Sequence, residues 1–147
     1  MKRFRGRVIT PGKVTASALV SVKKLDIPSS FQKPLDSGDR DSVCADGNNP
    51  DLYGKPMAGK ALCLPGAVYS DEGGMLLYCA CAGKQQPACL LFSGCVDAVT
   101  ASGAILAASW LDDVQMPVID NLGEAFLRHV ENGMTVTIED GGVVCVG

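Results

Sequence analysis

The sequence predicts an α/β domain with a β/β/α layered arrangement. Between residues 60 and 130, short apolar runs alternate with longer helical segments, an order typical of parallel strands with helices packed against the sheet. Two pairs of extended segments, within residues 4–22 and 134–146, flank this region and predict an antiparallel part. With 147 residues, 47% of them hydrophobic, the chain has the size and composition of one folded domain, which we expect to cover residues 1–147.

Residues 4–9 and 14–22 form the first pair of predicted strands. A Pro11-Gly12 turn separates them, which supports strands on either side, and the second segment alternates loosely between apolar and polar residues. The following residues 26–59 differ, because proline, glycine, aspartate and serine punctuate them and no periodicity is visible. We interpret residues 26–59 as a long loop or insertion, which is either functional or a solvated excursion.

The alternation of strands and helices begins with residues 60–65, which read as a short buried strand. Ser70 is predicted to cap the N-terminus of the next helix. Asp71 and Glu72 would then lie in the first turn, where acidic side chains suit the positive end of the helix dipole. We expect this helix to run to about Gly83, which would serve as its C-terminal stop.

The rest of the chain continues this alternation and then turns back as a hairpin. Asp97 is predicted to begin a helix whose glycine and alanines allow close packing against a sheet. An Asp140-Gly141-Gly142 turn separates two apolar segments and predicts an antiparallel pair. The further elements are strands at 87–92 and 116–119, helices at 97–110 and 122–130, and hairpin strands at 134–139 and 143–146.

Charge and hydropathy exclude several functional classes. Thirteen basic and 16 acidic residues give a net charge of −3, which argues against general affinity for nucleic acid. The longest apolar runs are too short to span a bilayer, and the basic residues 1–7 are not followed by the apolar core of a signal peptide. We therefore expect a cytoplasmic protein that binds neither nucleic acid nor membrane.

The cysteines favour buried thiols over a disulfide framework or a metal site. There are seven, so a closed set of disulfides would leave one over. The only close pair, Cys79 and Cys81, lies in a predicted helix, where residues two apart point to different faces. Zinc sites usually use two pairs at wider spacing. The other cysteines are Cys44, Cys63, Cys89, Cys95 and Cys145.

His129 is the only histidine of the chain. A single histidine leaves little room for a histidine-rich metal site or a Ser-His-Asp hydrolase. Swivelling domains that carry phosphate on histidine make His129 a candidate phosphocarrier. It falls late in a predicted short helix, however, where a cation simply complements the helix dipole, and we favour this structural role.

The loop from residue 65 to 74 is the best candidate for a functional site. It joins the carboxyl end of a predicted strand to a helix N-terminus, where open α/β sheets bind ligands and free N–H groups attract anions. Ser70 would direct its hydroxyl at such a ligand, or it only caps the helix. Asp71 and Glu72 weaken a simple anion site and are candidates to carry protons or to bind a cationic group on a partner. Three further side chains are plausible neighbours: Tyr69, Lys13 and Lys60.

Several segments, taken in order, resemble one known family. They are Gly6-Arg7-Val8 followed by Pro11-Gly12, then residues 18–21, 52–65, 87–91 and 103–107, with Pro117-Val118 after them. Their order and spacing are similar to the aconitase X swivel domain family, and the resemblance covers nearly the whole chain. It implies a swivelling β/β/α domain that resembles the mobile fourth domain of aconitase.

The resemblance further implies the small subunit of a two-chain hydro-lyase, a dehydratase that acts on a small hydroxy acid. The partner would be a large aconitase-X-type subunit, which carries the cysteines for an iron–sulfur cluster, so that no cofactor is expected on this chain. The small domain closes over the substrate and contributes a serine as catalytic acid or base. By position this serine is Ser70, and the residues expected to contact the substrate are Gly66, Tyr69, Asp71, Glu72 and Gly73.

The 65–74 loop also departs from the family pattern. An arginine and a run of small hydroxyl residues are usual here, whereas this chain has Ala67-Val68-Tyr69 before Ser70 and two acidic residues after it. The usual aromatic-glycine segment after the second strand is replaced by residues 27–31. Two main hypotheses follow: a dehydratase subunit in which Ser70 transfers a proton, and a divergent, non-catalytic swivel domain that serves as a binding or assembly module.

Overall fold

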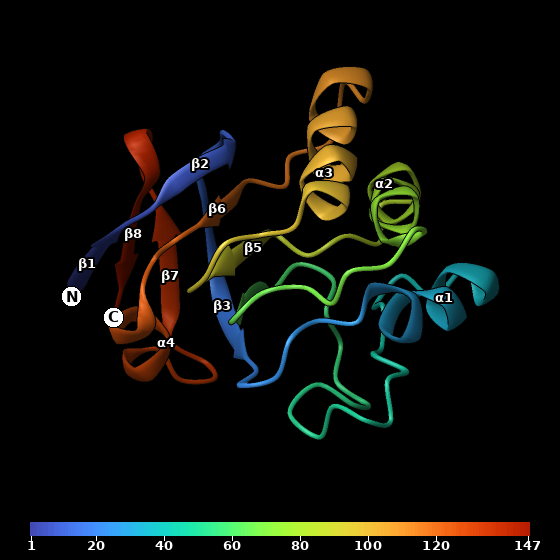
Figure 1. Ribbon diagram of the computed structural model, residues 1–147, viewed down its shortest axis with the longest axis horizontal. Helices are drawn as coiled ribbons and strands as arrows, with labels where there is room; N and C mark the ends of the chain where they lie inside the picture. Colours follow the sequence, from blue (N-terminus) through green and yellow to red (C-terminus); the bar gives the residue numbers. More distant parts are fainter.

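The structure, a computed structural model that describes residues 1–147, is built from eight strands and four helices (Figure 1). The strands are β1 (Lys2–Arg5), β2 (Arg7–Thr10), β3 (Val14–Val20), β4 (Ala61–Leu64), β5 (Cys89–Phe92), β6 (Val118–Asp120), β7 (Thr135–Ile138) and β8 (Val143–Val146). The helices are α1 (Ile27–Ser37), α2 (Gly73–Ala82), α3 (Ala98–Trp110) and α4 (Glu124–His129). A single 3-10 turn, η1 (Asp140–Gly142), joins β7 to β8.

The strands form one mixed sheet in the order β1-β8-β7-β3-β4-β5-β6-β2. The four strands β3, β4, β5 and β6 are parallel neighbours, and all other pairings are antiparallel. Figure 1 shows α1, α2 and α3 together on one side of the sheet, with α4 beside β7 and β8. The predicted β/β/α arrangement and the predicted β7–β8 hairpin are therefore confirmed.

The central parallel strands are apolar on both faces because each face packs against a different core. Along β4, Leu62 and Leu64 belong to a cluster of 20 buried residues that includes side chains of α1, α2 and α3. Ala61 and Cys63, which point the other way, belong to a second cluster of 13 residues with β7, β8 and α4. A strand buried on both faces shows a continuous apolar run, which is the pattern that the sequence displays.

Gly6 allows the sheet to close almost into a barrel. It is the only residue between β1 and β2, yet these strands lie at opposite ends of the strand order. Its N–H donates to the Gly142 carbonyl at 3.0 Å, and a Cβ at this position would overlap the Asp120 carbonyl. The expected single strand over residues 4–9 is therefore split at Gly6, and the expected pairing of the first two segments does not form, because β2 pairs with β6.

The expectation of an aperiodic loop over residues 26–59 is wrong for its first part, which forms α1. The Asp26 carboxylate accepts a hydrogen bond from the N–H of Ser29 at 3.1 Å and caps the helix. Pro28 lies in the first turn, where backbone N–H groups have no partner within the helix, so the N–H that proline lacks is not needed. Gly38 ends the helix with φ of 68°, a left-handed conformation that favours glycine. The remainder of the segment contains no helix or strand.

The other predicted helices are observed with small shifts of their ends. Asp97 caps α3, and its carboxylate accepts a hydrogen bond from the N–H of Thr100 at 3.0 Å, as the sequence predicts. Gly83 is the C-terminal cap residue of α2, also as predicted. No helix of the structure has both the length and the apolar character needed to cross a membrane.

Candidate functional site

The carboxyl ends of the parallel strands bring three loops together. The loop after β4 begins at Pro65, the loop after β3 contains Leu25, and the loop after β5 contains Gly94. The Gly94 N–H donates to the Pro65 carbonyl at 3.0 Å, and the Leu25 carbonyl accepts from the N–H of Val68 at 2.8 Å. These hydrogen bonds fix the 65–72 loop between its two neighbours, at the edge of the sheet where open α/β folds place ligands.

Ser70 has a buried hydroxyl without a hydrogen-bond partner. Helix α2 begins at Gly73, and Glu72 occupies the N-cap position without a capping hydrogen bond from its side chain. The expected cap at Ser70 is therefore wrong, and Asp71 and Glu72 precede the helix instead of lying in its first turn. The Ser70 Oγ is one of four buried side-chain atoms with no partner on this chain, whereas buried polar atoms of proteins are usually paired.

Because Gly73 has no side chain, there is room for the Ser70 side chain beside it. A Cβ at this buried glycine would lie 3.3 Å from the Ser70 Oγ and 3.7 Å from Cδ1 of Ile27. The Gly73 N–H donates to the Ser70 carbonyl at 3.3 Å, which closes a tight turn before the helix. The Ser70 hydroxyl therefore sits directly against the N-terminus of α2.

Tyr69 and Asp71 form the exposed rim of the loop. The Tyr69 hydroxyl donates to Oδ1 of Asp71 at 3.0 Å, and both residues are exposed. The hydrogen bond to Asp71 raises the pKa of Tyr69 above its ordinary value, and the negative charges of Asp71 and Asp97 act in the same direction.

Three acidic residues at this edge have no basic partner. Asp71, Glu72 and Asp97 form none of the ion pairs of the structure. Oδ2 of Asp97 caps α3, whereas its Oδ1 is buried and unpaired. The sequence indicated Asp97 only as a helix start, and its nearness to the loop arises because the loops after β4 and β5 are neighbours.

Lys24 is the basic side chain that approaches the loop. Its Cε lies 3.8 Å from the point that a Cβ on the buried Gly66 would occupy. The lysines considered from the sequence lie elsewhere, because Lys13 directly precedes β3 and Lys60 directly precedes β4, at the amino ends of the strands. Lys13 forms an ion pair with Asp140 at 3.3 Å. The expectation that Lys13 and Lys60 lie near the site is therefore wrong.

His129 is the last residue of α4 and does not belong to the loop cluster. Its ring centroid lies 5.7 Å from that of Phe4, and the side chain is half-buried. A basic residue in the last turn of a helix complements the helix dipole. This placement agrees with the structural role favoured for His129 from the sequence.

The cysteines of this chain are not gathered in one place with other metal-binding side chains. No group of three or more histidine, cysteine, aspartate or glutamate side chains is arranged to hold a metal ion. Cys63 and Cys89 both lie in the apolar cluster inside the sheet, and burial raises the pKa of Cys63 to about 12. Iron–sulfur clusters bind to thiolates, whereas burial keeps these groups protonated.

The comparison with known families finds a match over nearly the whole chain. Residues 3–146 match the family described as the aconitase X swivel domain. The chain belongs to this family. The resemblance to the aconitase X swivel domain noted in the sequence is thereby confirmed over nearly the whole chain.

Relatives of this swivel domain include both a sequence match and solved structures. It is 30% identical over 135 residues to the phosphomevalonate dehydratase small subunit of Methanothermobacter thermautotrophicus, with 90% of each chain covered. It superposes on Thermococcus kodakaraensis aconitase X, in the crystal structure of its holo-form, with a TM-score of 0.81, 23% identity, and coverage of 100% of this chain and 99% of that chain. A UPF0107 protein solved by solution NMR gives a TM-score of 0.79 at 22% identity, with 99% of each chain covered. These structural matches confirm the predicted fold.

Proposed function

We propose that this chain is the small subunit of an aconitase-X-type hydro-lyase that dehydrates a small hydroxy acid, with Ser70 as the proton-transfer residue. Family membership and 30% identity to a phosphomevalonate dehydratase small subunit support this reaction class. The buried, unpaired Oγ of Ser70 carries the assignment of the role. An unsatisfied polar atom is costly, so its retention at a strand–helix junction favours use by a ligand.

A serine hydroxyl rarely ionises at neutral pH, and the N-terminus of α2 would make its alkoxide more accessible. The first N–H groups of a helix lack intrahelical partners, and those of Gly74 and Met75 donate to no acceptor on this chain. Together with the helix dipole, these donors would stabilise an alkoxide on the adjacent Ser70 Oγ. Lys24, whose Cε approaches Gly66, would add positive charge in a chain that lacks the usual loop arginine.

The remaining loop residues have distinct parts in the proposal. Gly66 and Gly73 are buried, so they would contribute backbone groups and space to the bound substrate. Tyr69, Asp71 and Glu72 are exposed and would meet the substrate or the partner as the two chains close. We assign any iron–sulfur cluster of the enzyme to the large subunit, as the family resemblance implies.

Co-expression with a large aconitase-X-type subunit and replacement of Ser70 by alanine test this proposal. We expect Ser70→Ala to lower kcat by about 10²–10⁴-fold, the range of general acid–base catalysis. The free energy of unfolding should stay the same or rise slightly, because the lost hydroxyl has no partner. Ser109→Ala, an exposed serine on α3, is the matched control and should retain full activity. Full dehydratase activity in Ser70→Ala would show that Ser70 is not the proton-transfer residue.

A second candidate, a non-catalytic binding or assembly module, is favoured by the three unpaired acidic side chains at the loop. It predicts that the chain binds a large subunit without any turnover that depends on residues 65–74. Turnover that is lost on replacing this loop would eliminate the second candidate.

A further inference from the structure

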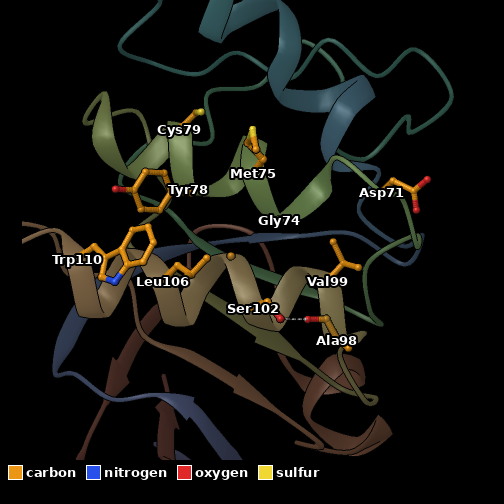
Figure 2. A pocket seen from close by; sticks show the side chains of 11 residues that line it. Asp71, Gly74, Met75, Tyr78, Cys79, Ala98, Val99, Ser102, Leu106 and Trp110 are labelled. Atoms are coloured by element: carbon orange, nitrogen blue, oxygen red, sulfur yellow. Dashed lines mark hydrogen bonds between the residues drawn. The ribbon is translucent and has the colours of Figure 1, made fainter.

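An apolar groove of about 620 Å³ runs between α2 and α3, directly beside the 65–72 loop (Figure 2). Asp71 lies at one end of the groove, and Trp110 at the other. Between them, α2 contributes Met75 and Tyr78, and α3 contributes Leu106. Most of the lining is therefore hydrophobic, although the groove lies on the surface of the molecule.

The groove exists because the two helices touch through glycines. A Cβ on Gly103 would overlap the Gly74 carbonyl and would lie 2.6 Å from the Gly74 Cα. At this crossing the backbones meet without intervening side chains. Farther along, Tyr78 and Trp110 face each other edge to face, with ring centroids 6.3 Å apart. The helices are thus held at a fixed spacing, and the groove between them is a preformed feature.

Three large exposed apolar side chains, Met75, Leu106 and Trp110, line this groove, and others lie on the same part of the chain. Six of the eleven exposed large hydrophobic residues of the chain lie on α2, on α3 or in the preceding loop. Trp110, the only tryptophan, is 69% exposed, and Met75 is 72% exposed. Clustered apolar surface of this kind marks an interaction site more often than scattered exposed residues do. The six are Val68, Tyr69, Met75, Ile105, Leu106 and Trp110.

We propose that the groove docks the large subunit of the dehydratase, through an apolar segment with a basic residue at the Asp71 end. This inference rests on the proposed function. Ser70 can act on a substrate held by another chain only if that chain reaches the loop, and Asp71 is the next residue along. The surface that continues from Asp71 along α2 and α3 is therefore contiguous with the place where the partner must approach.

Charge complementarity specifies the chemistry of the partner. Asp71 lines the loop end of the groove, and Glu72 and Asp97 are next in the chain to the lining residues Asp71 and Ala98. None of the three acidic residues has a basic partner on this chain. Lysine or arginine on the large subunit would pair with them and would fix the direction in which the apolar segment lies. Trp110 supplies a rigid aromatic anchor, the residue type that contributes most to binding at interfaces.

The affinity of the purified chain for a purified large subunit, measured by titration calorimetry without substrate, tests the proposal. We expect Trp110→Ser to raise Kd by about 30-fold, as loss of an interface hot spot does. Tyr53→Ser is the matched control, since Tyr53 is 59% exposed on the irregular segment after α1; its Kd should stay within about twofold. Asp71→Lys should raise Kd by about tenfold, and less so at high salt.

Activity measurements separate this inference from the proposed function. When the Trp110→Ser variant is titrated into the large subunit, the dehydratase activity should approach the plateau reached with the wild-type chain. The concentration that gives half of this plateau should rise by the same factor as Kd. An unchanged Kd in Trp110→Ser would overturn the docking surface and leave the Ser70→Ala test untouched. The wild-type chain could instead form a homodimer that Trp110→Ser dissociates, while the Kd for the large subunit is unchanged. That result would assign the groove to a second copy of the chain and overturn the proposal. Failure of the wild-type chain to bind the large subunit would overturn both.

Discussion

Arg7 and Asp120 form a two-pronged ion pair between β2 and β6. The Arg7 Nε donates to Oδ1 of Asp120 at 2.9 Å, and its Nη2 donates to Oδ2 at 2.6 Å. The Asp120 side chain is fully buried, whereas Arg7 is half exposed. Oδ2 also accepts the N–H of Val96 at 2.9 Å. One carboxylate thereby ties the edge strand β2 to the loop after β5, which carries Asp97.

The first prediction is that Asp120 makes stability depend on acid pH. Burial acts to raise the pKa of Asp120, but the hydrogen bonds from Arg7 and Val96 and the Arg7 charge outweigh it and hold the pKa below its usual value. This stabilisation is fully present above the unfolded-state pKa of about 3.9 and is lost as pH falls through the lower folded-state pKa.

We therefore expect the free energy of unfolding in urea to fall with decreasing pH below about 4, and Asp120→Asn to weaken that dependence. Asp120→Asn should also be less stable than the wild type at neutral pH, because it loses the charge that pairs with Arg7. Asp112→Asn, at an exposed aspartate, is the control. The same pH dependence in Asp120→Asn and the wild type would contradict the prediction.

The second prediction concerns the crossing of α2 and α3. Gly103→Ala should destabilise the protein by about 1–3 kcal/mol, since the added methyl group must displace the Gly74 backbone. This result would run against helix propensity, which alone favours alanine over glycine by about 1 kcal/mol. Ser109→Ala, on the exposed side of the same helix, should change stability by less than about 0.5 kcal/mol. Chemical denaturation measures both, and equal stability of the two variants would refute the close crossing.

The third prediction is a pattern of thiol reactivity. Cys79 and Cys95 are the two exposed cysteines, and the other five are buried. Burial also raises the pKa of Cys81 to about 12, which lowers its thiolate fraction further. Brief treatment of the folded protein with iodoacetamide should label Cys79 and Cys95, and treatment in denaturant should label all seven. Peptide mass mapping reads out the sites, and rapid labelling of Cys63 in folded protein would show that the core is not closed.

The fourth prediction is a delayed ionisation of Tyr69. Its hydroxyl donates to Asp71, and tyrosinate at this position would be repelled by Asp71 and Asp97, so the pKa of Tyr69 is raised. In an ultraviolet titration, the difference between the wild type and Tyr69→Phe should show ionisation above the usual value of about 10. Asp71→Asn should bring this ionisation to lower pH, and Asp36→Asn, far along the chain, should not. An unchanged titration in Asp71→Asn would mean that the Tyr69–Asp71 contact does not persist in solution.

The central alternation of strands and helices was predictable because each element carries its own signal. The segments that became β4 and β5 are continuous apolar runs, and Asp97 and Gly83 mark helix ends. Helix α1 was not predicted, because its prolines suggested a loop. The buried pair Ile27 and Phe31, spaced four residues apart, was the helical signal in that segment.

The candidate site was predictable only where it is local in sequence. The 65–74 loop follows from the rule that ligands bind at the carboxyl ends of parallel strands. The contributions of Lys24 and Asp97 depend on the lateral order of β3, β4 and β5, which no single segment encodes. The helix start at Gly73, rather than after Ser70, leaves the Ser70 hydroxyl without the capping bond that its residue type suggests.

The split at Gly6 has a consequence for how the protein folds. Lys2 in β1 pairs with Val146 in β8, and Arg7 in β2 pairs with Asp120 in β6. Both N-terminal strands therefore pair with segments that are synthesised much later. Contacts between residues so distant in the chain slow folding, because a long loop must be closed before any of them forms. During synthesis the parallel strands β3, β4 and β5 can associate first. We expect the N-terminal strands to join the two ends of the sheet as one of the last events.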